Sequence, residues 1–132
     1  MICYLYPEPI YLFFTTGVPE LLYYSHIPTT IFAILVGFFV LIKGKRLLLN
    51  KLLFLITLCF SLWTFLNLFA WTNIHSDFIL LIWPYFGIFS ASLSVLSIYF
   101  IYVFLYQKDV PFKMKLTFFL LLAPLLIFAP TN

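Results

Sequence analysis

The chain has 132 residues, of which 65% are hydrophobic and 8% charged, and its formal net charge is +3. Because an average soluble domain is about a quarter charged, this composition excludes a soluble globular domain, and the mean hydropathy of +1.16 is typical of an integral membrane protein. The basic residues flank apolar stretches, so the positive charge does not indicate nucleic-acid binding.

The apolar stretches are expected to form helices. Within a bilayer every backbone polar group needs an internal partner, and these stretches are too long and too continuous for barrel strands. We therefore predict an all-α fold, a polytopic membrane helical bundle with four transmembrane helices. The two cysteines, Cys3 and Cys59, form no CxxC pair, so neither a disulfide framework nor a metal cluster is expected.

Residues 1–24 are interrupted by three prolines and a glycine and contain no Lys or Arg, which excludes an ordinary signal peptide. Tyrosines favour the headgroup zone, so we expect a tail on the outer membrane interface. The first span is predicted over 25–43, with Ser25 as its cap, Pro28 in its first turn and Gly44 after its last residue.

The second span is predicted over 52–72 and the third over 78–107. Only about five residues separate them, so they are expected to be antiparallel neighbours. Each has small and polar residues at spacings of three and four, which places them on one helix face, and we expect the two stripes to pack together. The stripes are Thr57, Ser61, Thr64 and Asn67 in the second helix and Gly87, Ser90, Ala91, Ser94 and Ser97 in the third.

The connections carry the charge. All seven Lys and Arg lie in or beside the first and third connections, and basic residues stay in the cytoplasm, so both termini are predicted to face outward. The leucines at 47–49 are expected to begin the second helix at the interface. A fourth span is predicted over 111–129, with Asp109 and Pro111 as cap and first turn and Pro124 as a kink.

A candidate site lies near the outer ends of the second and third spans. Pro84 leaves the carbonyl of Leu80 without its helical partner, and Asn67 is the expected donor. The Trp63 ring is expected to lie against Gly87. We interpret this region either as helix packing or as an outward-facing pocket. Its residues are Trp63, Asn67, Trp83, Pro84, Tyr85, Gly87, Ser90 and Ser94.

Residues that carry chemistry are sparse. No Asp, Glu, Lys, Arg or His lies in the interior of a predicted span, away from its terminal turns, which argues against a pump or an ion-coupled carrier. A serine hydrolase would need a base at depth, and the two histidines, His26 and His75, are too few for a metal site. We therefore expect no catalytic residue, no metal and no cofactor, and we predict that the chain is not an enzyme.

The chain resembles the N-terminal seven-helix membrane region of bacterial sensor histidine kinases over residues 24–132. The likeness rests on helix spacing, on Trp63, Trp71 and Trp83, and on the Lys-Asp-x-Pro turn at 108–111. The matching stretches are YSHIPTTIFAILVGFFVLIKGKR, NKLLFLITLCFSLWTFLNLFAW, LLIWPYFGIFSASL, YFIYVFLYQKDVPFKMKL and LLLAPLLIFAPTN. The resemblance implies a multi-pass location in a bacterial cell membrane, with an outer N-terminus.

Such a family has seven spans followed by a cytoplasmic kinase, whereas four spans are predicted here. The chain is therefore expected to be the front part of a sensor, a signal-transducing module truncated before the kinase. Its expected partners are the lipid bilayer and either a second copy or the missing C-terminal helices and kinase domain, with no nucleic acid. The alternative is a small free-standing membrane subunit that packs against a larger complex; a channel or carrier built by oligomerisation is a third hypothesis.

Overall fold

The computed structural model describes residues 18–44, 47–74 and 77–128, and the regular structure in this part of the chain is entirely helical. The elements are α1 (Glu20–Lys43), α2 (Leu48–Thr72), α3 (Phe78–Tyr106) and α4 (Phe112–Phe128). The predicted all-α fold with four helices is confirmed. Most of the predicted interfacial tail, residues 1–17, lies outside the described part.

Three of the helices are long and apolar enough to cross a membrane: α1, α2 and α3, with 24, 25 and 29 residues. At the helical rise they are about 36, 38 and 44 Å long, against a bilayer core of about 30 Å. The described part of α4 has 17 residues, or about 26 Å. The crossing of the membrane by α4 therefore stays a prediction.

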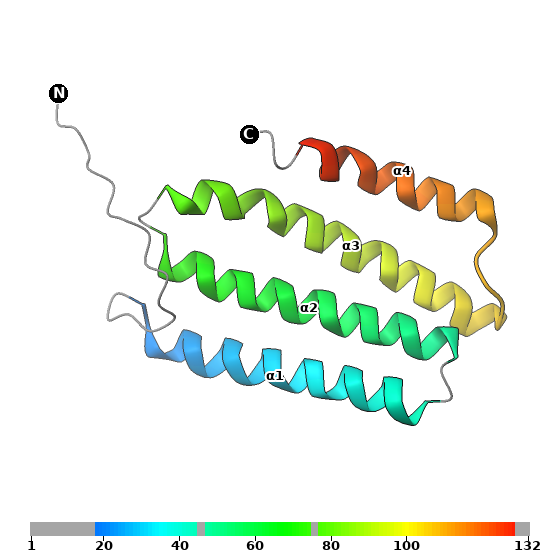
Figure 1. The fold of residues 1–132 in the computed structure, drawn as a ribbon, viewed down its shortest axis with the longest axis horizontal. Coiled ribbons are helices and arrows are strands. Elements are labelled where there is room, and N and C mark those ends of the chain that lie inside the picture. The colour runs from blue at the N-terminus through cyan, green and yellow to red at the C-terminus, as the bar shows by residue number, and fades with distance from the viewer. Residues whose placement is uncertain (1–17, 45–46, 75–76, 129–132) are drawn as a thin grey trace.

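The four helices lie side by side in chain order and alternate in direction (Figure 1). In the described ranges, each helix packs against its neighbours in the sequence, and the backbones of the pairs α1–α3, α1–α4 and α2–α4 do not approach closely. The arrangement is thus an open row of helices rather than a bundle closed around a central core. As a consequence, large apolar side chains are exposed along the row, among them Phe32, Phe119 and Leu120.

The helix α1 begins at Glu20, and the prediction that Ser25 caps it is wrong. No helix breaker lies between Pro19, the N-cap residue, and Pro28, so the helix forms over this stretch as well. The Ser25 hydroxyl instead donates to the carbonyl of Leu22 at 3.0 Å. Pro28 consequently lies inside the helix and not in its first turn. At the other end, Gly44 follows the last helical residue as predicted.

The remaining helix ends fall close to their predicted positions. The helix α2 begins at Leu48, in the leucine stretch that was expected to start it at the interface. Asp77 occupies the N-cap position of α3, although its side chain makes no capping hydrogen bond, and Gln107 ends α3 in a left-handed conformation with φ 52°. That conformation turns the chain toward α4.

Two small apolar clusters join neighbouring elements, one at each end of the helices. One contains Val18 and Tyr23 near the start of α1 and Leu68 near the end of α2. The other contains Leu52 of α2, Val103 of α3 and Val110 of the turn before α4. The second cluster connects three consecutive elements, so it fixes how the α3–α4 turn sits beside the start of α2.

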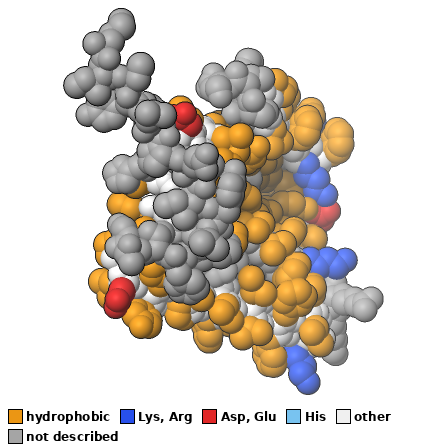
Figure 2. Space-filling model, turned by 60° about the vertical axis from the view of Figure 1, so that its left-hand side comes forward, with side chains coloured by type: hydrophobic (Ala, Val, Ile, Leu, Met, Phe, Trp, Pro, Cys, Tyr) orange, Lys and Arg blue, Asp and Glu red, His pale blue; other side chains and the backbone are white. Residues whose placement is uncertain are grey.

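The described lysines gather at one end of the helices, together with the acid Asp109, whereas the other described acids lie at the opposite end (Figure 2). One end is formed by the last residues of α1 and α3 and the first residues of α2 and α4. The described basic residues at that end are Lys43, Lys51, Lys108, Lys113 and Lys115. Glu20 and Asp77 lie at the other end, at the starts of α1 and α3. The apolar surface between the two ends is compatible with a membrane location.

Candidate functional site

The polar stripe of α2 faces α1. The Oγ1 atoms of Thr30 and Thr64 are 2.7 Å apart, and the Ser61 hydroxyl lies 3.4 Å from the carbonyl oxygen of Thr30. Ser61 and Thr64 are buried. We call this contact the polar seam; it comprises His26, Thr30 and Gly37 of α1 and Thr57, Ser61, Thr64 and Asn67 of α2. Interhelical hydrogen bonds of this kind hold helices together where lipid provides no hydrophobic drive.

The half-buried His26 and Asn67 form one end of the polar seam. His26 Nδ1 lies 3.0 Å from the carbonyl oxygen of Leu22, and His26 Nε2 lies 3.1 Å from Asn67 Nδ2. Because a carbonyl oxygen only accepts hydrogen bonds, Nδ1 is the protonated nitrogen, and Nε2 accepts from the amide of Asn67. Both ring nitrogens of His26 are therefore hydrogen-bonded, and α1 is connected to α2 at this level.

Ser25 also lies beside this histidine, with Oγ 2.9 Å from Nδ1. A serine nucleophile needs a base that accepts its proton. In the tautomer fixed by Leu22 and Asn67, Nδ1 already carries a proton, and the Ser25 hydroxyl itself donates to Leu22. This arrangement favours a positioned hydrogen-bond network over an activated nucleophile.

Gly37 marks a close approach of α1 to α2 in the polar seam. It is buried, and a Cβ atom built on it would overlap Oγ1 of Thr57, with the Thr57 Cβ at 3.2 Å and the Phe54 ring at 3.3 Å. Small residues allow membrane helices to approach in this way. Sequence reasoning missed Gly37, although His26, Thr30 and Gly37 follow one another at spacings of four and seven and so share a helix face.

The predicted packing of the α2 and α3 stripes is wrong. A Cβ atom on Gly87 would meet nothing within 4 Å, so the Trp63 ring does not cover this glycine. Ser90 and Ser94 are exposed, and the Ser94 hydroxyl donates to the Ser90 carbonyl of its own helix at 3.0 Å. The physical reason is that the polar face of α2 is already occupied by α1, so α3 packs against another side of α2.

Apolar and aromatic side chains join α2 to α3, which are neighbours as predicted. The rings of Phe69 and Phe78 are 5.5 Å apart, and those of Trp63 and Phe86 are 6.4 Å apart, both edge to face. Ile82 lies one helical turn from each of Phe78 and Phe86 and is only 2% exposed. The face of α3 that contacts α2 therefore contains Phe78, Ile82 and Phe86.

The remaining predicted site residues do not converge on a pocket with Asn67. Trp83 contacts Phe86 with ring centroids 6.0 Å apart but is 68% exposed, and Tyr85 is 39% exposed. Pro84 is half-buried. The expected hydrogen bond from Asn67 to the Leu80 carbonyl is replaced by the bond to His26. The Phe86 ring of α3 thus contacts both Trp63 and Trp83. Asn67 instead lies on the side of α2 that faces α1.

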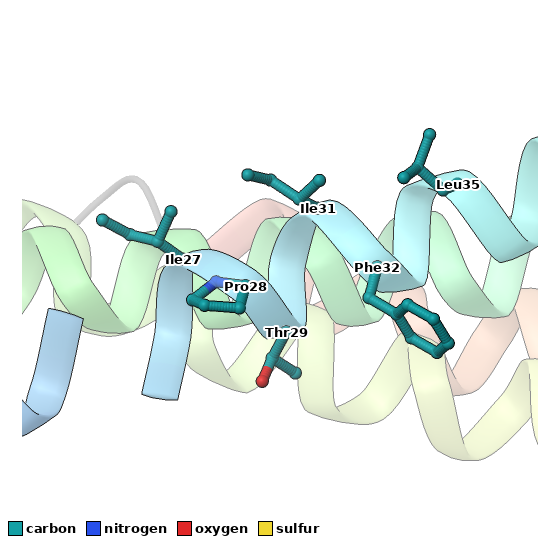
Figure 3. A pocket seen from close by; sticks show the side chains of 6 residues that line it. All are labelled: Ile27, Pro28, Thr29, Ile31, Phe32 and Leu35. Atoms are coloured by element: carbon teal, nitrogen blue, oxygen red, sulfur yellow. The ribbon is translucent and has the colours of Figure 1, made fainter. Parts of the chain in front are cut away.

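A hollow of about 620 Å³ lies along α1, and the lining residues in the described part of the chain all belong to that helix (Figure 3). It is open, and its lining is almost entirely apolar. The lining residues are Ile27, Pro28, Thr29, Ile31, Phe32 and Leu35. The proline ring has no backbone N–H and leaves one carbonyl of the preceding turn without its partner. Such a surface accommodates an acyl chain or an apolar side chain and provides no group for acid–base chemistry.

The turn between α3 and α4 contains an ion pair that the sequence analysis did not anticipate. Asp109 Oδ2 accepts from Lys115 Nζ at 2.6 Å, and Oδ1 accepts from the Tyr99 hydroxyl at 2.5 Å and from the backbone N–H of Val110 at 2.7 Å. The hydrogen bond from Lys115, followed by that from Tyr99, holds the pKa of the Asp109 carboxyl below its usual value of 3.8. Asp109 therefore organises the turn that precedes α4.

Metal-binding chemistry finds no support in the described ranges, where no group of three or more His, Cys, Asp or Glu side chains comes together. His75 lies outside these ranges. Comparison with protein-family models, with curated proteins and with solved structures finds no match to this chain. The evidence for function is therefore the arrangement of the helices, the polar seam between α1 and α2, and the distribution of charge.

Proposed function

We propose that the chain is a multi-pass membrane module that crosses the bilayer four times, with its lysine-bearing end in the cytoplasm. The support is the length of α1, α2 and α3, the exposed apolar surface between the two ends, and the separation of the lysines from Glu20 and Asp77. Basic residues flanking spans stay on the cytoplasmic side. In this orientation α1 begins and α2 ends on the outer side.

Within the membrane the module has a non-catalytic role in sensing or signal transduction, as the resemblance to the membrane region of bacterial sensor histidine kinases implies. The observation that carries this proposal is the open row of helices. The described part of α4 packs against α3, and its exposed residues Phe119 and Leu120 leave one side for another helix. Consecutive elements usually lie side by side, so the helices that follow in such a sensor would continue the row at α4.

A second candidate function is that of a small subunit of a larger membrane complex. The hollow on α1 favours it, because this apolar surface lies at the opposite edge of the row and is lined by exposed residues such as Ile31, Phe32 and Leu35. In this case the partner would pack against α1 and not beyond α4. The two functions therefore predict contacts at different edges of the same row.

Photo-crosslinking in native membranes tests both functions. A photoreactive phenylalanine analogue replaces Phe119 on α4 in one variant and Phe32 on α1 in the other, so the two probes differ only in the edge they report. If the chain is part of a sensor, position 119 is expected to cross-link to helices of a protein with kinase activity, measured as transfer of phosphate from labelled ATP. Capture at position 32 of a membrane complex without that activity supports the subunit. Lipid adducts alone at both positions contradict both proposals.

A further inference from the structure

Four lysines form a row of unpaired cations at one end of the molecule. Lys43 ends α1, Lys51 lies in the first turn of α2, Lys108 follows α3, and Lys113 lies in the first turn of α4. All four are exposed, and none of them forms an ion pair with another residue in the described part of the chain. We call this set the lysine row. It gives each of the four helices one cation at the same end.

The one described acid at this end does not neutralise the lysine row. The carboxylate of Asp109 is committed to Lys115, to the Tyr99 hydroxyl and to the Val110 N–H. Lys115 also lies 6.0 Å above the Tyr99 ring. Because Asp109 is paired with Lys115, no described acid at this end is left to pair with the lysine row, and its counter-charges must come from outside the described part of the chain.

We propose that the lysine row binds the phosphate groups of anionic lipids. Clusters of four or more basic residues immediately beside membrane spans bind anionic headgroups, and an ammonium group donates hydrogen bonds to phosphate oxygens. Exposed apolar side chains adjoin the lysines: Leu105 and Tyr106 precede Lys108, and Phe112 precedes Lys113. These side chains can contact the glycerol and acyl part of a lipid, which inorganic phosphate lacks.

This inference rests on the proposed insertion into a membrane and adds the lipid class that the cytoplasmic end selects. It also predicts a difference between the two ends. Glu20 and Asp77 give the outer end a negative charge in the described residues, so anionic lipid is expected to concentrate around the lysine row only.

The test uses the full chain reconstituted in phosphatidylcholine vesicles that contain phosphatidylglycerol. The enrichment of phosphatidylglycerol around the protein is measured from the lipid retained after mild detergent extraction. The variants K43Q/K51Q and K108Q/K113Q are each expected to lower the association constant, by roughly fivefold per lysine removed, since one basic residue near such a surface contributes about this factor. The control variant E20Q/D77N removes charge at the other end and is expected to retain the enrichment.

Raising the ionic strength from about 0.15 M to about 1 M shortens the Debye length from about 8 Å to about 3 Å, so it should weaken the enrichment in the unmodified chain. Equal retention in the lysine variants and the unmodified chain overturns the inference. Inorganic phosphate that displaces phosphatidylglycerol at equal concentration also overturns it, because a free anion site would then explain the binding. Alkaline extraction provides a separate check: a chain released by it is not inserted, which refutes the membrane proposal itself.

Discussion

Asn67 of α2 donates a hydrogen bond to the imidazole of His26 on α1, with 3.1 Å between Nδ2 and Nε2. This bond fixes the direction in which the polar side of α2 faces, because His26 Nδ1 is itself held by the Leu22 carbonyl at 3.0 Å. If α2 turned its polar side away from α1, His26 could keep its bond to Asn67 only by losing its bond to the Leu22 carbonyl. The polar stripe of α2 is therefore turned toward α1 and away from α3.

A double-mutant cycle on this pair tests the contact. Asn67→Ala is expected to destabilise the folded protein by about 0.6 kcal/mol, the average for interhelical hydrogen bonds in membranes. Once His26 is replaced by Ala, the same change at position 67 should cost nearly nothing, because its partner is gone. The measurement is reversible unfolding in detergent micelles. Strictly additive effects would show that Asn67 has a different partner.

Disulfide cross-linking tests the α1–α2 contact directly. The Oγ1 atoms of Thr30 and Thr64 are 2.7 Å apart, and the sulfur atoms of cysteines at these positions would approach the bonding distance of about 2.05 Å. In a chain lacking Cys3 and Cys59, the pair Thr30→Cys and Thr64→Cys is expected to cross-link under mild oxidation. The outcome is read as a mobility shift on a non-reducing gel.

The matched control pairs Thr64→Cys with Gly87→Cys, the combination that packing of the α2 and α3 stripes would favour. A Cβ atom on Gly87 contacts nothing within 4 Å, so this pair is expected to stay reduced. Cross-linking of the control and not of the first pair would restore the packing inferred from the stripes and reject the polar seam.

The number of helices and most of their ends followed from the sequence because they depend on local properties: the length of an apolar run, the position of prolines and glycines, and the placement of lysines. The partner of each helix face is a tertiary property. A polar stripe on α2 has neighbours on both sides, and short connections bring α1 as well as α3 beside it. The deciding signal was on α1, in the shared face of His26, Thr30 and Gly37.

The candidate site depended on the same tertiary property. Antiparallel pairing of α2 and α3 placed Asn67 level with Trp83 and Pro84 and Trp63 near Gly87, whereas in the structure Trp63 and Trp83 each contact Phe86. The assignment of Asn67 to Pro84 relied on equal depth alone, and depth does not specify direction around a helix. The apolar face of α3 that contacts α2 has no distinctive residue type, because the apolar residues of this helix lie on all its sides.

The Asp109 carboxylate predicts a pH dependence of the α3–α4 turn. The hydrogen bond from Lys115 lowers the pKa of Asp109 in the folded state from its usual value of 3.8. The ionised carboxylate therefore stabilises the turn at pH values above the unfolded-state pKa. The contribution is lost as the pH falls through the lower folded-state pKa. We expect the backbone N–H resonance of Val110, which donates to Oδ1, to titrate in this acidic range. Asp109→Asn should abolish that titration while leaving other amide resonances unchanged.

Accessibility labelling tests the proposed orientation. In a chain lacking native cysteines, Asp77→Cys at the start of α3 is expected to react with a membrane-impermeant maleimide added to intact cells. Lys108→Cys, which follows α3 at its other end, should react only after the membrane is permeabilised. The two positions flank the same helix, so each serves as the control for the other. The reverse pattern would invert the topology, and labelling of both from outside would deny that α3 crosses the membrane.

Substitutions at two glycines distinguish the observed packing of α2 against α1 from the packing of the α2 and α3 stripes that the sequence predicts. Gly37 is buried against Thr57 and Phe54, so Gly37→Leu must push α1 away from α2 and is expected to cost about 1–3 kcal/mol, as overpacking does. Gly37→Ala should cost less, since Thr57 Oγ1 can rotate away while its Cβ and the Phe54 ring need only small shifts.

Gly87→Leu is the matched control, because it adds the same side chain to a helix position where a Cβ atom meets open space. Its effect is expected to stay within about 0.5 kcal/mol, the usual range for exposed positions. Unfolding of both variants in the same micelles gives the comparison, and helix propensity cancels because each change replaces Gly with Leu inside a helix. If Gly87→Leu destabilised the protein more than Gly37→Leu, α3 would have to pack through its small-residue stripe, and the polar seam between α1 and α2 would not be the contact that fixes the row.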